Sequence, residues 1–152
     1  MISHKLVIGG ALSSLFLAAP MPAAPAATDT TTLTLNISGM RNQKGNMLIC
    51  VTKNPNRFPN CSVDPAALKA KIPTRQSGRV VFKAIAPGTW AVAMLHDENA
   101  NNDLDTTATL PNEGFGFSRN PVVSRSAPKF SAAAVKIGAT PAALSIRLQY
   151  LM

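Results

Sequence analysis

The most regular pattern in this sequence is the run Leu144-Ser145-Ile146-Arg147-Leu148-Gln149-Tyr150. Apolar and polar residues alternate along it, and successive side chains of a β-strand point to opposite faces of a sheet. The pattern predicts a strand that buries Leu144, Ile146, Leu148 and Tyr150 and exposes the three residues between them.

The same alternation recurs at residues 33–38, 47–52, 79–84 and 90–95, and turn residues such as Pro87-Gly88 separate these segments. Short strands at this spacing, without long helical patterns between them, are typical of a sandwich of two sheets. We therefore predict an all-β fold, an antiparallel Ig-like sandwich of about six or seven strands. One short helix is expected at Asp64–Lys71, where Asp64 is suited to cap the helix and Pro65 to occupy its first position.

The N-terminal residues have the composition of a secretory signal. Lys5 supplies a positive charge, an apolar run extends from Leu6 to Ala19, and Ala24-Pro25-Ala26 fits the A-x-A pattern of a cleavage site. We predict a signal peptide over residues 1–26 and a single mature domain over 27–152, located in the periplasm or secreted. The competing interpretation is a membrane anchor, but the apolar run is shorter than the roughly 20 residues that span a bilayer, and no transmembrane segment is expected.

Charge is unevenly distributed along the chain, which has a formal net charge of +8. Five of its seven acidic residues fall within residues 97–113, a segment that we call the acidic loop. The rest of the chain is basic, which is compatible with a partner such as a cell-envelope polysaccharide, another anionic surface or another exported protein. The sequence contains no nucleic-acid recognition motif and no basic run, so nucleic acid is not an expected partner.

Two cysteines, Cys50 and Cys61, are present. In an oxidising compartment such a pair favours a disulfide bond, and we predict a structural bridge between them. The residues that they enclose include Pro55 and Pro59.

The acidic loop carries oxygen-bearing side chains at every second position. The residues concerned are Asp97, Asn99, Asn101, Asp103 and Asp105. This alternation is similar to the start of calcium-binding loops, and calcium is the cofactor that it suggests. Asn102 stands where such loops have Gly, and Ala108 where they have a bidentate Glu. The other interpretation is a long turn whose Asp and Asn side chains accept hydrogen bonds from its own backbone.

Candidate binding residues flank this segment: His96, Glu113, Phe115, Phe117 and Arg119. His96 beside Asp97 has the residue types of a general base with a carboxylate, so a hydrolase or lyase that uses His96 with Asp97 or Glu113 is one hypothesis. No G-x-S-x-G elbow is present, and His96 has the parity of buried Trp90, Val92 and Met94, which favours a core-edge histidine.

Several segments together resemble a bacterial family of domains of unknown function, DUF2141. The matching segments are Leu33–Gly39, Gly45–Val51, Phe58-Pro59, Pro87–Ala93, His96–Asn99, Leu104–Thr106, Pro111, Glu113–Ser118 and Leu144–Tyr150. The resemblance implies an exported domain with a transthyretin-like or carboxypeptidase-regulatory-like sandwich and no assigned activity. The chain departs from the family at Ala100 and Asn102, where glycines are usual, and in having Cys50 and Cys61.

These patterns favour an exported, non-enzymatic binding or structural module whose acidic loop is stabilised by calcium or by its own hydrogen bonds. The alternatives are the hydrolase or lyase described above and a binder of cell-envelope polysaccharide or another anionic surface.

Overall fold

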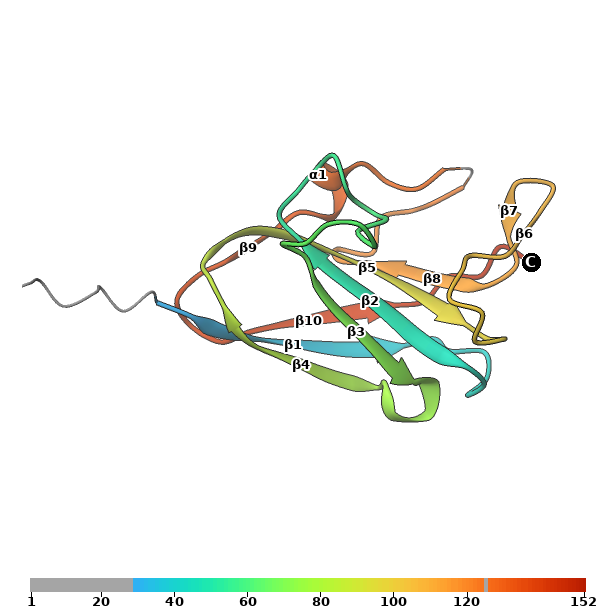
Figure 1. The fold of residues 1–152 in the computed structure, drawn as a ribbon, viewed down its shortest axis with the longest axis horizontal. Coiled ribbons are helices and arrows are strands. Elements are labelled where there is room, and N and C mark those ends of the chain that lie inside the picture. The colour runs from blue at the N-terminus through green and yellow to red at the C-terminus, as the bar shows by residue number, and fades with distance from the viewer. Residues whose placement is uncertain (1–28, 125) are drawn as a thin grey trace, which may run out of the picture.

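The computed structural model describes residues 29–124 and 126–152, and its regular secondary structure consists almost entirely of strands (Figure 1). The strands are β1 (Thr31–Ser38), β2 (Asn46–Thr52), β3 (Leu68–Pro73), β4 (Arg79–Ile85), β5 (Gly88–Asp97), β6 (Thr106–Thr107), β7 (Leu110–Pro111), β8 (Gly114–Phe117), β9 (Val135–Ile137) and β10 (Ala142–Arg147). A 3-10 turn, η1 (Thr74–Gln76), and one short helix, α1 (Phe130–Ala133), complete the described elements. The prediction of an all-β fold is confirmed.

The predicted signal peptide, residues 1–26, lies outside the described residues. Among the residues that the structure describes, no helix combines the length and the apolar character needed to cross a membrane.

Two main sheets share one hydrophobic core. The first has the strand order β10-β1-β4 and the second the order β3-β2-β5-β8, with β9 paired to the start of β5. Alternate residues of the facing strands fill the space between them, including Leu33 and Leu35 of β1, Val51 of β2 and Ile146 of β10, each almost wholly buried. The alternation in the sequence therefore identified which side of each of these strands faces the core.

One strand pair differs from the predicted antiparallel arrangement, because β1 and β10 run parallel, with Leu35 opposite Leu144. The chain enters β10 from β9, which pairs with the beginning of β5 at Gly88–Trp90. Residues 138–141 then carry the chain from the second sheet to the first, at the end of the molecule where β5 and β1 both begin (Figure 1). β10 must then run in the same direction as β1.

The predicted helix at Asp64–Lys71 is wrong. Residues 68–73 form β3, which pairs antiparallel with β2. The local helix signals cover too few residues to form a helix alone, and pairing with β2 outweighs them. The Asp64 carboxylate instead accepts hydrogen bonds from the Thr52 hydroxyl at 2.9 Å and the Ala66 amide at 3.0 Å.

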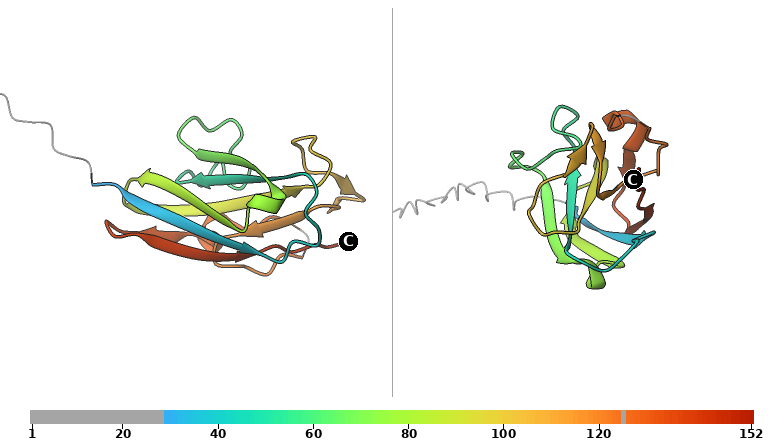
Figure 2. Two further views of the ribbon diagram at one scale, coloured as in Figure 1. Left: turned by 90° about the horizontal axis from the view of Figure 1, so that it is seen from below. Right: turned by 90° about the vertical axis from the view of Figure 1, so that its right-hand side faces the viewer.

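The central strand β5 is buried on both faces. Val92 and Met94 point into the shared core, and Ala91 and Ala93 pack on the other face against a second apolar cluster. That cluster brings together Phe115 and Phe117 of β8 with Phe58, Phe130 and Leu151. Figure 2 shows the loops that rise beyond the β3-β2-β5-β8 sheet, among them the loop before β3 and the acidic loop.

Candidate functional site

The acidic loop begins at the end of β5, where Asp97 is fully buried. Its carboxylate accepts hydrogen bonds from the backbone amides of Asn101 and Asn102, each at 3.0 Å. Asn102 has a positive φ of 69°, a conformation that Asn tolerates better than most residues. Asp97 thus holds the first turn of the loop.

Glu113 closes the base of the same loop. Its side chain is buried, and its two carboxylate oxygens accept hydrogen bonds from the amides of Glu98 at 2.9 Å and Asp105 at 3.2 Å. Burial raises the pKa of Glu113, the nearby charges of Asp105 and Asp97 add to this, and the two amide hydrogen bonds oppose it. Through its two amide hydrogen bonds, Glu113 holds the backbone of the acidic loop at Glu98 and at Asp105.

Asp105 is hydrogen-bonded within the loop by Asn99 at 2.6 Å and by Asn101 at 3.2 Å. The Asn99 and Asn101 side-chain oxygens accept from the amides of Asn101 and Asp103. This pattern agrees with the self-capped turn. Within residues 29–124 and 126–152 no three His, Cys, Asp or Glu side chains are placed to hold a metal ion, and calcium binding stays a prediction.

His96 lies inside the molecule with no exposed surface. Its Nε2 is 2.9 Å from the carbonyl oxygen of Lys44, which can only accept, so Nε2 carries the proton. Its Nδ1 then accepts from the Tyr150 hydroxyl at 2.7 Å. The Asp97 side chain points to the opposite face of β5, as strand geometry requires. Both ring nitrogens of His96 are thus used in structural contacts, Nδ1 with Tyr150 near the C-terminus and Nε2 with Lys44, which agrees with the core-edge interpretation.

Arg41 joins this arrangement to the acidic loop and to the C-terminal residues. Its Nε donates to Glu98 at 2.7 Å, its two terminal nitrogens donate to the carbonyls of Met152 and Asn112, and its guanidinium stacks 4.7 Å from the centre of the Tyr150 ring. Burial raises the pKa of Glu98, but hydrogen bonds from Arg41 and Asn42 and the charge of Arg41 outweigh it, so this pKa lies below its usual value. We call Arg41, His96, Glu98 and Tyr150 the Arg41 cluster.

We expect Glu98→Gln to lower the free energy of unfolding at pH 7 by about 1 kcal/mol, because Arg41 is 39% exposed and solvent screens the pair. A lowered folded-state pKa means that the contribution is present above the unfolded pKa, about 4.3, and is lost as the pH falls through the folded value. Urea unfolding at pH 7 and pH 3 measures this. The variant should be less stable than the wild type at pH 7, and this difference should be smaller at pH 3; an equal difference at both pH values contradicts the assignment.

A groove of about 670 Å³ lies on the face of the β3-β2-β5-β8 sheet that points away from the shared core. We call it the outer groove. Two rows of side chains cross its floor, each from β3 through β2 and β5 to β8. The first row is Lys71, Leu48, Leu95 and Phe115, and the second is Lys69, Cys50, Ala93 and Phe117. Each row therefore begins with an ammonium group and ends with an aromatic ring.

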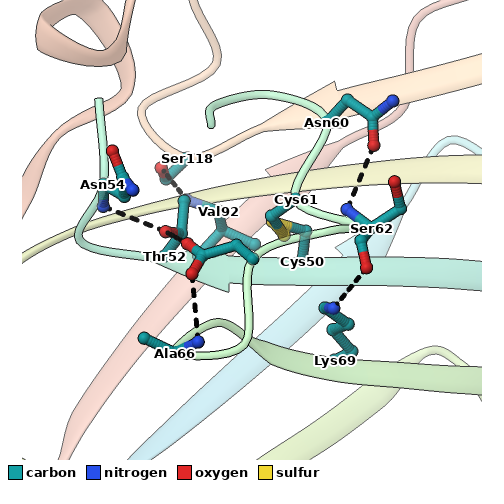
Figure 3. Close-up of a disulfide and its surroundings, with 11 residues drawn as sticks. Cys50, Thr52, Asn54, Asn60, Cys61, Ser62, Ala66, Lys69, Val92 and Ser118 are labelled. Atoms are coloured by element: carbon teal, nitrogen blue, oxygen red, sulfur yellow. Dashed lines mark hydrogen bonds between the residues drawn. A yellow bond between two sulfur atoms is a disulfide. The ribbon is translucent and has the colours of Figure 1, made fainter. Parts of the chain in front are cut away.

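Three segments distant in sequence form the walls of the outer groove. They are the region around Cys61, the acidic loop from Asn102 to Pro111, and the segment that contains Val123 and Ala127. The disulfide between Cys50 and Cys61, predicted from the sequence, is present and ties the first wall to β2 (Figure 3). Lys69 reinforces that wall by donating to the Ser62 carbonyl at 2.6 Å (Figure 3). Leu151, next to the anchored Tyr150, completes the lining.

Of the predicted binding residues, the structure places Phe115 and Phe117 in the outer groove. His96 and Glu113 are buried in the contacts described above, and Arg119 donates to the carbonyl of Ser131 at 3.3 Å. Sequence reasoning missed Leu48, Leu95 and the two lysines. The sequence did contain a signal for an apolar outer face. Both faces of β2 and β5 are apolar, whereas a sheet with one solvated face usually has polar residues on that face.

Comparison with known proteins identifies the family of the chain. A family model described as an uncharacterized protein conserved in bacteria, DUF2141, matches residues 35–145. No curated protein and no solved structure matches the chain. The resemblance predicted from the sequence is confirmed, and the finer assignment to an Ig-like or transthyretin-like sandwich stays a prediction.

Proposed function

The chain belongs to DUF2141, a bacterial family described only as uncharacterized, and we propose that it is an exported, non-catalytic module that binds a small, largely apolar ligand in the outer groove. The observation that carries this proposal is the groove itself, an apolar concavity of about 670 Å³ on a sheet face that strand alternation would normally make polar.

The size and lining of the groove agree with a ligand site. Small-molecule sites usually enclose about 300–1,000 Å³ and are lined mainly by apolar and aromatic side chains with a few polar groups. The outer groove has two phenylalanines and two leucines on its floor and only a few charged residues at its margin. The two phenylalanines are already buried, whereas Leu48 and Leu95 are partly exposed, and covering these leucines with an apolar ligand is favourable because it removes apolar surface from water.

The walls are held in place before any ligand arrives. The disulfide fixes the wall around Cys61, Asp97 and Glu113 fix the acidic loop, and Tyr150, held by His96, positions Leu151. A preformed site avoids the entropic cost of ordering its loops on binding. His96, Asp97 and Glu113, which have the residue types of a catalytic set, therefore stabilise the walls of the outer groove.

Export is part of the proposal. It is supported by the three-part N-terminal pattern of residues 1–26 and by the disulfide, since disulfides persist mainly in oxidising compartments.

The first test is binding of N-phenyl-1-naphthylamine, a neutral dye whose fluorescence rises in apolar surroundings. We expect saturable binding to the purified protein and a Kd at least about tenfold weaker in Leu48→Asn, because burial of a leucine side chain contributes about 1.5–3 kcal/mol. Fluorescence titration measures both.

Val81→Asn is the matched control, because Val81 also points outward from a strand but lies on β4 in the other sheet. It should change the Kd by less than about twofold, since the dye does not contact it. Absence of saturable binding in the wild type, or equal weakening by both substitutions, would remove the groove as the ligand site.

A further inference from the structure

The charged residues of the outer groove are unevenly placed. Its ionisable lining consists of two lysines on β3 and Asp103 on the acidic loop. Both lysines belong to the edge strand of the sheet, at the same end of the two floor rows. The opposite end of the rows carries only phenylalanine side chains. The ionisable lining, two lysines and one aspartate, has a formal net charge of +1, and the groove has a cationic margin at β3 and an apolar end at β8.

The two lysines have no acidic partner in the described part of the chain. The Nζ atom of Lys69 donates to a backbone carbonyl, and that of Lys71 donates to the Asn102 side-chain oxygen at 2.5 Å. The ion pair among the described residues joins Arg41 to Glu98. Two ammonium groups that contact only neutral oxygens leave positive charge at the margin of an apolar floor, and this charge is complementary to an anion.

The dimensions of the floor define the shape of a matching ligand. Neighbouring strands lie about 4.8 Å apart, so each row of four side chains spans about 14 Å from β3 to β8. An unbranched hydrocarbon tail of that length would run along such a row from the lysines towards the two phenylalanines, which are themselves buried.

We propose that the ligand of the outer groove is a single-chain amphiphile with an anionic head group, and that Lys69 and Lys71 bind this head while the tail lies on the floor between the two rows. This inference rests on the proposed function, because it assigns the ligand class of the same groove. It adds the requirement that the ligand carries a negative charge, which the apolar floor alone does not impose.

The test compares decanoate with decyltrimethylammonium, which have similar tails and opposite charges, as competitors that displace N-phenyl-1-naphthylamine at pH 7.5. Decanoate is expected to bind the wild type at least about tenfold more tightly. The double variant Lys69→Gln/Lys71→Gln should bind decanoate about tenfold more weakly and decyltrimethylammonium no more weakly than before, since two favourable charges are removed and the apolar floor is retained.

The control is Lys83→Gln/Lys136→Gln, which removes the same charge from exposed lysines on β4 and β9 that do not line the groove. It should leave decanoate binding within about twofold of the wild type. Equal binding of the two competitors by the wild type, or an equal loss in both double variants, overturns the inference while leaving the proposed function intact. Absence of dye binding to the wild type overturns both.

Discussion

Gly45→Ala is expected to lower the free energy of unfolding by about 3 kcal/mol or more, because backbone strain and a steric clash add together. Gly45 has a φ of +62°, in the left-handed region that costs a residue with a Cβ about 1–2 kcal/mol. A Cβ at this position would also stand 1.9 Å from the carbonyl oxygen of Asp97, which is a backbone atom and cannot move away without displacing the end of β5.

Urea unfolding of Gly45→Ala and of Gly78→Ala measures this effect. A Cβ added at Gly78 would have no atom within 4 Å, and the φ of Gly78 is not positive, so its substitution should change stability by less than about 0.5 kcal/mol. If both variants are as stable as the wild type, the close approach of Gly45 to Asp97 does not exist in solution.

The second large effect is expected from the disulfide. Cys50→Ser/Cys61→Ser should lower the free energy of unfolding by about 2–3 kcal/mol, because the cross-link restricts a short loop of the unfolded chain. Cys61 is also buried, so the substitution places a hydroxyl in an apolar contact. The same loss should weaken dye binding, since Cys50 and Cys61 both line the outer groove.

Thermal unfolding with and without dithiothreitol provides the control. The reductant should lower the melting temperature of the wild type by roughly 10 °C and leave that of the double serine variant unchanged. A wild type whose melting temperature does not respond to the reductant, and equals that of the variant, would show that the bond contributes nothing to stability.

The contrast between β1 and β3 shows where sequence reasoning succeeded and where it failed. In β1 leucine alternates with threonine and asparagine, and the structure buries the face that carries the leucines while the other face is more exposed. The two-residue period of the sequence therefore matched the burial of the strand. In residues 64–71 the signals were local, and the outcome depended on pairing with β2, which starts some twenty residues earlier in the chain. Local propensity does not encode such pairing.

The candidate site divides in a similar way. Phe115 and Phe117 were found because two aromatic residues that alternate with glycines stand out in any sequence, and both line the groove. His96, Asp97 and Glu113 were noticed for the chemistry of their side chains, but those side chains bond to backbone groups of the same segment or of distant ones. His96 bonds in addition to the Tyr150 hydroxyl. The residue types do not reveal that all three side chains are buried and bonded within the fold.

By itself, the sequence determined that this protein is built from strands, which faces of β1, β2 and β10 are buried, that Cys50 and Cys61 pair, and which family it belongs to. These properties follow from periodicity, composition and short motifs, all of which are local. Only the tertiary structure decided that β10 joins β1 in parallel, that β3 is a strand, and that Lys71, Leu48, Leu95 and Phe115 form one row. Strand register between distant segments set these outcomes, and register depends on how all the apolar faces are buried together.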